Sequence, residues 1–94
     1  PEPGTGEVVT RFSTSGDRHW GINIGSYPSR FKAEQVLLRT ALAEIGMLDE
    51  ALRKVVRGQQ GYNANFVGMT KEHAALACRR LEARRMSCET LGPG

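Results

Sequence analysis

Hydrophobic and polar residues alternate at period two in two segments of the chain, residues 19–27 and residues 62–67. The apolar members are Trp20, Ile22 and Ile24 in the first segment and Tyr62, Ala64 and Phe66 in the second. Glycines and asparagines fill most of the positions between them. Because side chains of a strand point alternately to its two faces, this pattern predicts two strands that each bury one face.

Two other segments carry apolar residues at helical spacing. After Pro28 ends the first strand, Ser29 is placed to cap a helix that we expect to end at Gly46 as a left-handed cap. Thr70 is placed to cap the second helix in the same way. The predicted buried positions are Ala33, Val36, Leu37, Ala41, Leu42 and Ile45 in the first helix and Ala74, Ala77, Cys78 and Leu81 in the second.

Two further strands complete the pattern, at residues 52–57 and residues 86–91, with residues 57–61 as a turn. Residues 48–51 either extend the first helix or form a short one of their own. The order strand, helix, strand, strand, helix, strand is the split βαβ arrangement of ferredoxin-like and RNA-recognition folds. We therefore predict an α+β fold, βαββαβ, with a four-stranded antiparallel sheet, two helices on one face and the other face open.

The chain has 94 residues, which is enough for one domain. Residues 1–18 are rich in proline, glycine, serine and threonine, a composition typical of flexible linkers, and residues 93–94 continue a Gly-Pro-Gly end. We expect a folded domain over residues 19–92. The absence of an initiator methionine fits a module taken from the C-terminal end of a larger protein.

The net charge is +3, from 13 Lys and Arg against 10 Asp and Glu, which is ordinary for a small domain. The densest basic cluster consists of Arg79, Arg80, Arg84 and Arg85, interleaved with Glu82 on the second helix. This pattern favours a solvated helix face over a phosphate-binding surface, which stays the alternative. No segment has the length and hydrophobicity of a membrane span or the pattern of a signal peptide, so we expect no membrane contact.

The first and third strands are central in this topology, so their outward-facing side chains should form one continuous open surface. The residues expected there are Asn23, Gly25, Tyr27, Asn63 and Asn65. Carboxamides both donate and accept hydrogen bonds, and glycine allows a ligand to approach the backbone. This chemistry suits a sugar polymer, although a polar sheet face also serves solubility alone.

The two cysteines, Cys78 and Cys88, lie on the second helix and the last strand. If Cys88 points toward the helices, the two sulfurs meet in the core and can form a disulfide, which indicates an oxidising compartment. The alternative is a pair of buried thiols in a cytosolic protein. With only His19 and His73 as further ligands, the spacing predicts no zinc or other metal site.

Catalytic patterns are absent from the sequence. Neither histidine has a partner arrangement typical of a triad, and no nucleophile elbow or paired-carboxylate motif occurs. The glycine runs at residues 21–25 and 58–61 lack the lysine and the strand-to-helix context of phosphate loops. We therefore expect a binding domain that needs no cofactor and is not an enzyme.

Three segments, taken in order, resemble the SPOR domain family. Residues 20–27, WGINIGSY, are similar to its opening strand, where an aromatic residue is followed by V-Q-V-G-S/A-F. Residues 62–69, YNANFVGM, are similar to its third strand of Y-R-A/V-R-F/V type. Residues 74–88 resemble its second helix, which ends A-C-x-x-L and is followed by a cysteine in the last strand. The resemblance covers about residues 19–92.

The resemblance implies a module of the bacterial periplasm or cell envelope that binds peptidoglycan glycan strands stripped of stem peptides. Such modules target a parent wall enzyme, here one similar to D-alanyl-D-alanine carboxypeptidases, to sites of cell division or remodelling. We expect the module to be a monomer.

The family's ligand-facing residues map onto this chain as Asn23 for a glutamine, Ser26 for the serine after the glycine, and Asn63 and Asn65 for exposed arginines. These departures shorten the reach of one side chain and remove two charges, which implies a weaker affinity or an altered ligand. Glu89 is expected at the rim of the open face. Tyr62 is expected to point inward, or to swing outward and stack on a sugar.

Two alternative functions are weighed against this one. Single-stranded RNA-binding domains share this topology but need aromatic rings on the central strands, where only Tyr27 is expected. We therefore expect no nucleic-acid partner. A protein-interaction module of the cell-division machinery is the second alternative.

Overall fold

The structure, a computed structural model, describes residues 18–93. The expected linker over residues 1–18 therefore lies outside the described residues except for Arg18, and so does Gly94. The elements in chain order are β1 (Trp20–Tyr27), α3 (Arg30–Ala43), α4 (Ile45–Leu48), β2 (Leu52–Gly58), β3 (Gly61–Met69), α5 (Lys71–Ala83) and β4 (Glu89–Leu91).

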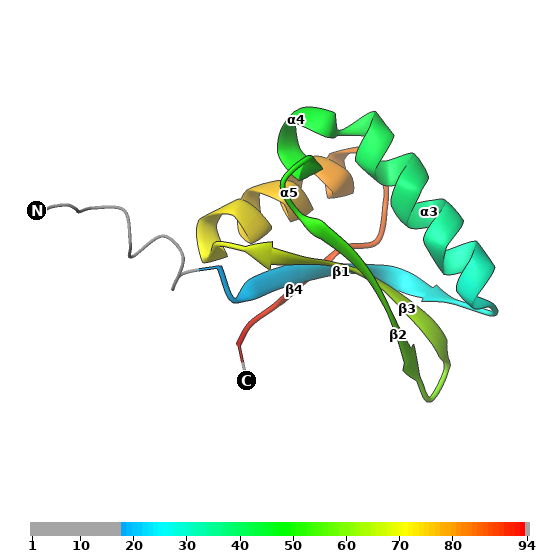
Figure 1. The fold of residues 1–94 in the computed structure, drawn as a ribbon. Helices are drawn as coiled ribbons and strands as arrows, with labels where there is room; N and C mark the ends of the chain where they lie inside the picture. The colour runs from blue at the N-terminus through cyan, green and yellow to red at the C-terminus, as the bar shows by residue number, and fades with distance from the viewer. Residues whose placement is uncertain (1–17, 94) are drawn as a thin grey trace, which may run out of the picture.

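The four strands form one antiparallel sheet in the order β2-β3-β1-β4. Figure 1 shows α3, α4 and α5 together on one side of this sheet, with β2 and β4 at its two edges. The predicted α+β fold is confirmed, and one element is added to it. The short helix α4 covers residues 45–48, so it overlaps only at Leu48 with residues 48–51, where the sequence allowed a short helix.

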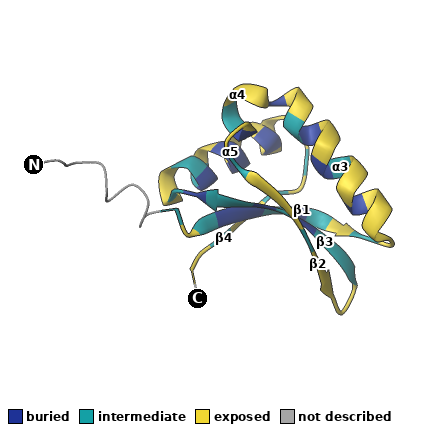
Figure 2. Cartoon of the chain, viewed as in Figure 1, coloured by how far each residue is buried: buried dark blue, intermediate teal, exposed yellow. Residues whose placement is uncertain are grey.

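The hydrophobic core lies between the sheet and the helices, where Figure 2 shows the buried residues. Its largest fully buried side chains are Phe66, Ile22, Ile24, Leu37, Leu48, Met69 and Leu81. The strands contribute through their alternate positions and the helices through one face each, as the periodicities predict. Burial of these side chains stabilises the domain by about 1.5 to 3 kcal/mol for each large aliphatic or aromatic residue.

Both predicted N-caps are present. The Ser29 hydroxyl accepts a hydrogen bond from the Lys32 amide at 3.1 Å, and the Thr70 hydroxyl accepts one from the His73 amide at 3.0 Å. Each cap satisfies one of the amides that a helix leaves without an internal partner. The starts of α3 and α5 are therefore determined by local sequence.

The end of the first helix was predicted wrongly. The helix α3 stops at Ala43, because Glu44 leaves the helical conformation with φ −131°, and Gly46 lies within α4 without a positive φ. Leu42 and Ile45 were expected to be buried but are 63% and 55% exposed. Leu42 lies five residues after the buried Leu37, about 140° around the helix, and Ile45 follows the break.

The last strand is shorter than predicted, since only residues 89–91 pair with β1. The chain first has to reverse after α5. The Met86 amide binds the Leu81 carbonyl at 3.0 Å and the Arg85 amide binds the Glu82 carbonyl at 2.9 Å, while Arg85 adopts a left-handed φ of 65°. These are the bonds of a Schellman motif, built here with an arginine where glycine is usual.

A disulfide joins Cys78 of α5 to Cys88, just before β4, with an S–S distance of 2.02 Å and a Cα–Cα distance of 5.3 Å. It confirms the predicted pairing and uses both cysteines of the chain. Because β4 has only three residues, this bond fixes the last segment of the chain beside the core.

Candidate functional site

The side of the sheet opposite the helices carries rows of side chains that run across the strands, and we call this side the open face. The strand register places residues of neighbouring strands directly opposite one another. The residues of the open face are Leu52, Lys54 and Val56 on β2; Asn63, Asn65 and Val67 on β3; Gly21, Asn23 and Ser26 on β1; and Glu89 and Leu91 on β4. Helices and strands of residues 18–93 add no second layer over it.

The central row of the open face is polar across all four strands. Lys54 pairs with Asn65, Asn65 with Asn23, and Asn23 with Glu89. A cation, two carboxamides and a carboxylate therefore follow one another over three strand spacings, about 14 Å. Such a row offers hydrogen-bond donors at one end, acceptors at the other and both in the middle.

The Asn23 carboxamide also has a structural role. Its nitrogen donates to the Asn65 side-chain oxygen at 2.8 Å, and its oxygen accepts from the Gly25 amide at 3.1 Å. The second bond closes a short turn within β1 and supports an irregularity in the strand between residues 23 and 26. Asn23 is therefore a positioning group as well as a candidate ligand contact, whereas Lys54 makes no side-chain bond to the described residues.

Two other rows flank the polar one. On one side, Leu52 pairs with Val67 and Leu91 with Gly21, which gives an apolar row in which Leu52 is 65% exposed. On the other side lie Val56, Asn63 and Ser26. The open face thus places apolar side chains directly beside hydrogen-bonding groups.

The predicted positions of Tyr27 and Gly25 on the open face are wrong. Between Asn23 and Ser26, β1 has one residue more than the facing part of β3, so a bulge at Gly25 shifts the alternation. Ser26 then shares a face with Asn63, and Tyr27 pairs with Tyr62 on the side of the helices. The Tyr27 ring fills the space where a side chain on Gly25 would lie, since its hydroxyl is 2.8 Å from that position.

Both tyrosines pack against the core instead of offering a ring to the open face. The Tyr27 hydroxyl donates to the Ile24 carbonyl at 2.7 Å, and burial raises the pKa of this phenol above its ordinary value. Two guanidinium groups lie over the Tyr62 ring, those of Arg30 at 5.5 Å and Arg57 at 5.7 Å from the ring centre. The Tyr62 ring points inward, which is one of the two orientations that the sequence allowed.

The open face therefore brings together Asn23, Ser26, Asn63, Asn65 and Glu89 from the predicted residues, and it leaves out Gly25, Tyr27 and Tyr62. Sequence reasoning missed Lys54. The hairpin loop consists of Gln59 and Gln60 alone, with Gly58 opposite Gly61. Had this two-residue loop been recognised, counting back along β2 would have placed Lys54 opposite Asn65.

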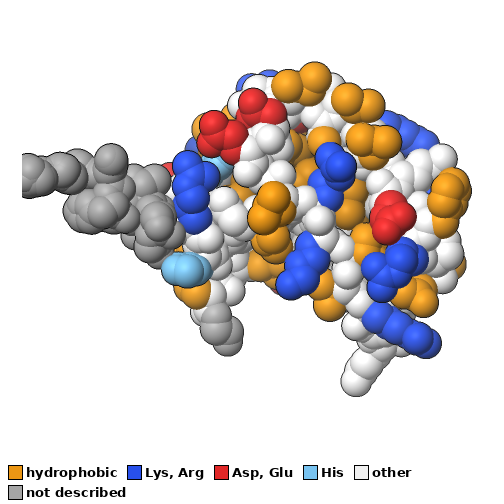
Figure 3. Space-filling view, viewed as in Figure 1, with side chains coloured by type: hydrophobic (Ala, Val, Ile, Leu, Met, Phe, Trp, Pro, Cys, Tyr) orange, Lys and Arg blue, Asp and Glu red, His pale blue; other side chains and the backbone are white. Residues whose placement is uncertain are grey.

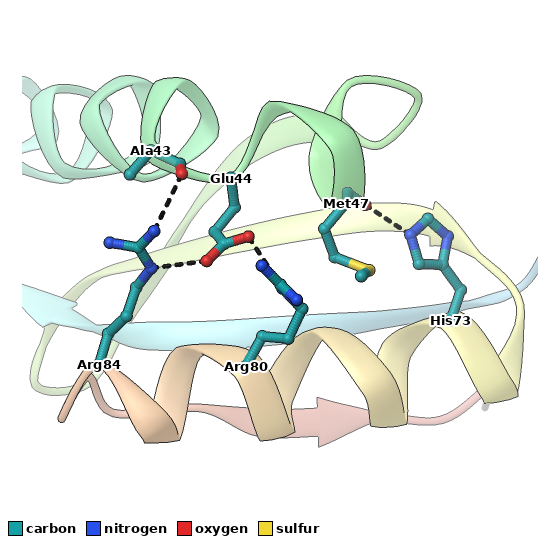
Figure 4. A network of polar contacts seen from close by, with 6 residues as sticks. All are labelled: Ala43, Glu44, Met47, His73, Arg80 and Arg84. Carbon is teal, nitrogen blue, oxygen red and sulfur yellow. Dashed lines mark hydrogen bonds and ion pairs between the residues drawn. The ribbon is translucent and has the colours of Figure 1, made fainter.

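Charged residues near the helices hold elements together. The Glu44 side chain, 7% exposed, accepts hydrogen bonds from Arg80 at 2.9 Å and Arg84 at 2.6 Å, as Figure 4 shows. The bonds from Arg84 and Arg80 hold the pKa of Glu44 below its ordinary value of 4.5, although burial acts in the opposite direction. Arg80 and Arg84 of the basic cluster therefore form ion pairs within the domain. The sequence suggested either a solvated helix face or a phosphate-binding surface for this cluster, and neither includes this role.

The His73 ring also acts between elements. Its Nε2 atom contacts the Met47 carbonyl oxygen, which ties the first turn of α5 to α4 (Figure 4). In the described chain, His, Cys, Asp and Glu nowhere gather in a group of three or more that could hold a metal ion. None of the helices within residues 18–93 combines the length and apolar character that a bilayer crossing requires.

Comparison of the chain with models of known protein families, with curated proteins and with solved structures finds no match.

Proposed function

We propose that this domain is a non-catalytic module that binds peptidoglycan glycan strands on its open face and targets a larger wall protein to sites of division or remodelling. One observation carries the proposal. The row of Lys54, Asn65, Asn23 and Glu89 crosses the whole sheet beside an apolar row, on a face without a second layer in the described chain. Sugars present hydroxyl and amide groups around a ring with apolar faces, so these two rows complement a glycan.

The SPOR resemblance of three segments supports the same proposal, because its ligand-facing positions map to Asn23, Ser26, Asn63 and Asn65, all on the open face. The chain differs from the family pattern by lacking arginines at positions 63 and 65. Lys54, across from Asn65, supplies a cation on the neighbouring strand and partly replaces the lost charge.

The disulfide supports a location in an oxidising compartment. We propose the bacterial periplasm, where a glycan-binding module meets its polymer. In the cytosol, reducing systems would keep Cys78 and Cys88 as thiols.

Binding to purified peptidoglycan sacculi tests this function. The protein should sediment with sacculi, and sedimentation should increase after an amidase has removed the stem peptides, because removal uncovers the glycan. Absent binding, or equal binding before and after the amidase, would contradict recognition of stripped glycan.

Variants of the open face connect this binding to the proposed surface. Lys54→Ala combined with Asn65→Ala should lower sacculus binding about tenfold or more, since two hydrogen-bonding groups are lost, one of them charged. The matched control is Arg79→Ala, which removes an exposed cation from α5 on the other side of the sheet. Binding that falls equally in both variants would indicate attraction by net charge, and unchanged binding in the double variant would exclude the open face.

Asn23→Ala together with Asn65→Ala should also weaken sacculus binding without unfolding the domain. This pair is the less selective test, because Asn23 also supports the bulge.

A specific observation favours protein interaction as a second function. Phe31, Leu38 and Leu42 of α3 are 73%, 49% and 63% exposed, and their spacing places them on one side of the helix. Phe31→Ser with Leu42→Ser should leave sacculus binding intact if glycan recognition is the main role.

RNA binding gains no support, because Tyr27 and Tyr62 lie on the side of the helices and not on the open face.

A further inference from the structure

A cavity of about 440 Å³ lies between α3 and β2, on the side of the sheet that the helices cover. Its lining residues are Arg30, Glu34, Leu37, Leu38, Arg53 and Val55. The volume is within the range of small-ligand sites, about 300 to 1,000 Å³. Figure 3 shows basic side chains over β2, with hydrophobic ones between them and α3. This cavity is separate from the open face, because Arg53 and Val55 alternate with the open-face residues along β2.

Three arginines surround this region. Arg30 and Arg53 line the cavity, and Arg57 reaches the same side of the sheet, where it and Arg30 contact the Tyr62 ring. Within residues 18–93, none of the three forms an ion pair, in contrast to Arg80 and Arg84, which both bind Glu44. Neighbouring cations repel one another, and the single carboxylate of Glu34 offsets only one of the three positive charges, so this cluster would be stabilised by a bound anion.

The start of α3 increases the positive potential. Arg30 is the first residue of the helix, and no acidic residue occurs in the first turn. The amino end of a helix carries a partial positive charge that favours anions. It adds to the charge of the guanidinium groups.

The remaining lining determines the kind of anion. Leu37, Leu38 and Val55 provide an apolar wall, and Glu34 contributes one negative charge. A nearby carboxylate disfavours a doubly charged phosphate more than a singly charged ligand. A guanidinium group matches a planar carboxylate through two parallel hydrogen bonds. The site therefore fits a singly charged carboxylate attached to a small apolar group.

We propose that the cavity between α3 and β2 binds a carboxylate-bearing group, as a second site apart from the open face. This inference rests on the proposed function in one respect, that peptidoglycan is the polymer that carries the carboxylate. Peptidoglycan has two sources, the lactyl carboxylate of muramic acid, which becomes free when stem peptides are removed, and the carboxylates of the stem peptides themselves. The glycan backbone would bind on the open face while a carboxylate of the same polymer enters the cavity.

Titration followed by amide NMR spectra tests the site with defined probes. N-acetylmuramic acid and L-alanyl-D-glutamate carry the two kinds of carboxylate, and N-acetylglucosamine is the neutral counterpart of the first. Saturable shifts at Arg53, Val55 and Leu38 with either acid, and none with the neutral sugar, would support the proposal. The acid that binds more tightly identifies the source. No shifts there with either acid, or equal shifts with N-acetylglucosamine, would overturn it.

Variants separate this site from the open face. Arg53→Gln should weaken binding of the acid about tenfold, because a charged hydrogen-bond donor is lost. Arg79→Gln, an exposed arginine on α5, should leave it unchanged. Arg30→Gln provides a second variant should Arg53→Gln fold poorly by circular dichroism, and unaltered affinity in a folded variant of either arginine would overturn the assignment.

The Lys54→Ala and Asn65→Ala double variant should bind sacculi about tenfold more weakly or worse and keep the shifts at the cavity. Loss of those shifts in this variant would overturn a separate second site. If unaltered protein fails to bind sacculi but still binds the acid in the cavity, the proposed function fails and the carboxylate site stands.

Discussion

Gly25 is the residue at which β1 changes the direction of its side chains. Before it, Asn23 faces away from the helices; after the bulge, Ser26 does so and Tyr27 packs beside Tyr62. The position requires glycine for two reasons, a φ of +118° and the Tyr27 hydroxyl 2.8 Å from where a Cβ would lie. A single backbone position thus decides which residues belong to the candidate site.

Replacement of this glycine should destabilise the domain. We expect Gly25→Ala to lower the free energy of unfolding by about 2 to 3 kcal/mol, because alanine at positive φ is strained and its methyl group would collide with Tyr27. Urea unfolding followed by circular dichroism measures the change. Gly46→Ala is the matched control: apart from its chain neighbours and the backbone of its own helix, no atom lies within 4 Å of its Cβ position, and alanine in α4 should stabilise by about 0.5 to 1 kcal/mol. Equal effects of the two changes would contradict the bulge argument.

Arg85 is a residue whose replacement should stabilise the protein. It holds a left-handed φ of 65° at the end of α5, which costs a residue with a side chain about 1 to 2 kcal/mol. Arg85→Gly should raise the free energy of unfolding by about 0.5 to 1 kcal/mol, since glycine avoids that cost but loses more chain entropy. The same substitution inside the helix, Arg79→Gly, should lower it by about 1 kcal/mol. Thermal melting of the two variants should therefore shift in opposite directions, and a decrease in both would be inconsistent with strain at Arg85.

At the scale of elements, Glu44 links α3 and α4 to α5. It is the residue between α3 and α4, and it accepts hydrogen bonds from Arg80 of α5 and from Arg84, which follows the last residue of that helix. Arg84 also donates to the Ala43 carbonyl at 3.2 Å. The break at Glu44 thus places a carboxylate where two guanidinium groups can reach it, and a straight helix would have carried it elsewhere.

This network predicts a dependence of stability on pH. Because the folded-state pKa of Glu44 is below its ordinary value of 4.5, its contribution is present above that pH and is lost as the pH falls through the lower, folded value. We expect Glu44→Gln to unfold at lower urea concentration than the unaltered protein at neutral pH, and the difference to shrink at about pH 3. Glu82→Gln removes an exposed carboxylate that pairs with no described residue, so it should show no such pH-dependent difference. A difference for Glu44→Gln that persists in acid would mean that the ion pairs do not cause it.

At the scale of the whole molecule, the order β2-β3-β1-β4 places the longest strand, β3, in the middle and the three-residue β4 at one edge. A strand of three residues contributes few hydrogen bonds by itself. The disulfide between Cys78 and Cys88 compensates by joining the end of the chain to α5. The small core and this bond together maintain the sheet that carries the open face.

Removal of the disulfide should therefore affect the entire domain. Cys78→Ala with Cys88→Ala should lower the free energy of unfolding by about 2 to 3 kcal/mol, the loop entropy expected for cysteines ten residues apart. Thiol titration of the unaltered, native protein should find no free thiol. Hydrogen exchange should accelerate first in β4 of the variant, and protection that is unchanged there would show that packing alone holds the strand.

Several parts of the fold follow from local sequence. Ser29 and Thr70 cap the two long helices because their hydroxyls bind amides three residues ahead, and this requires no distant contact. The alternation around Ile22 and Phe66 sets which faces of β1 and β3 are buried. The predicted surface residues Asn63 and Asn65 are accordingly on the open face.

Other parts depend on the packed molecule. The sequence alone determined the type and order of the main elements, since periodicity and capping act within a few residues of the chain. Only the tertiary structure decided that Tyr27 turns inward, that Lys54 faces Asn65 and that Glu44 meets two arginines from another helix. Each of these depends on strand register or on helix placement, which are set by the simultaneous burial of side chains from segments far apart in the chain.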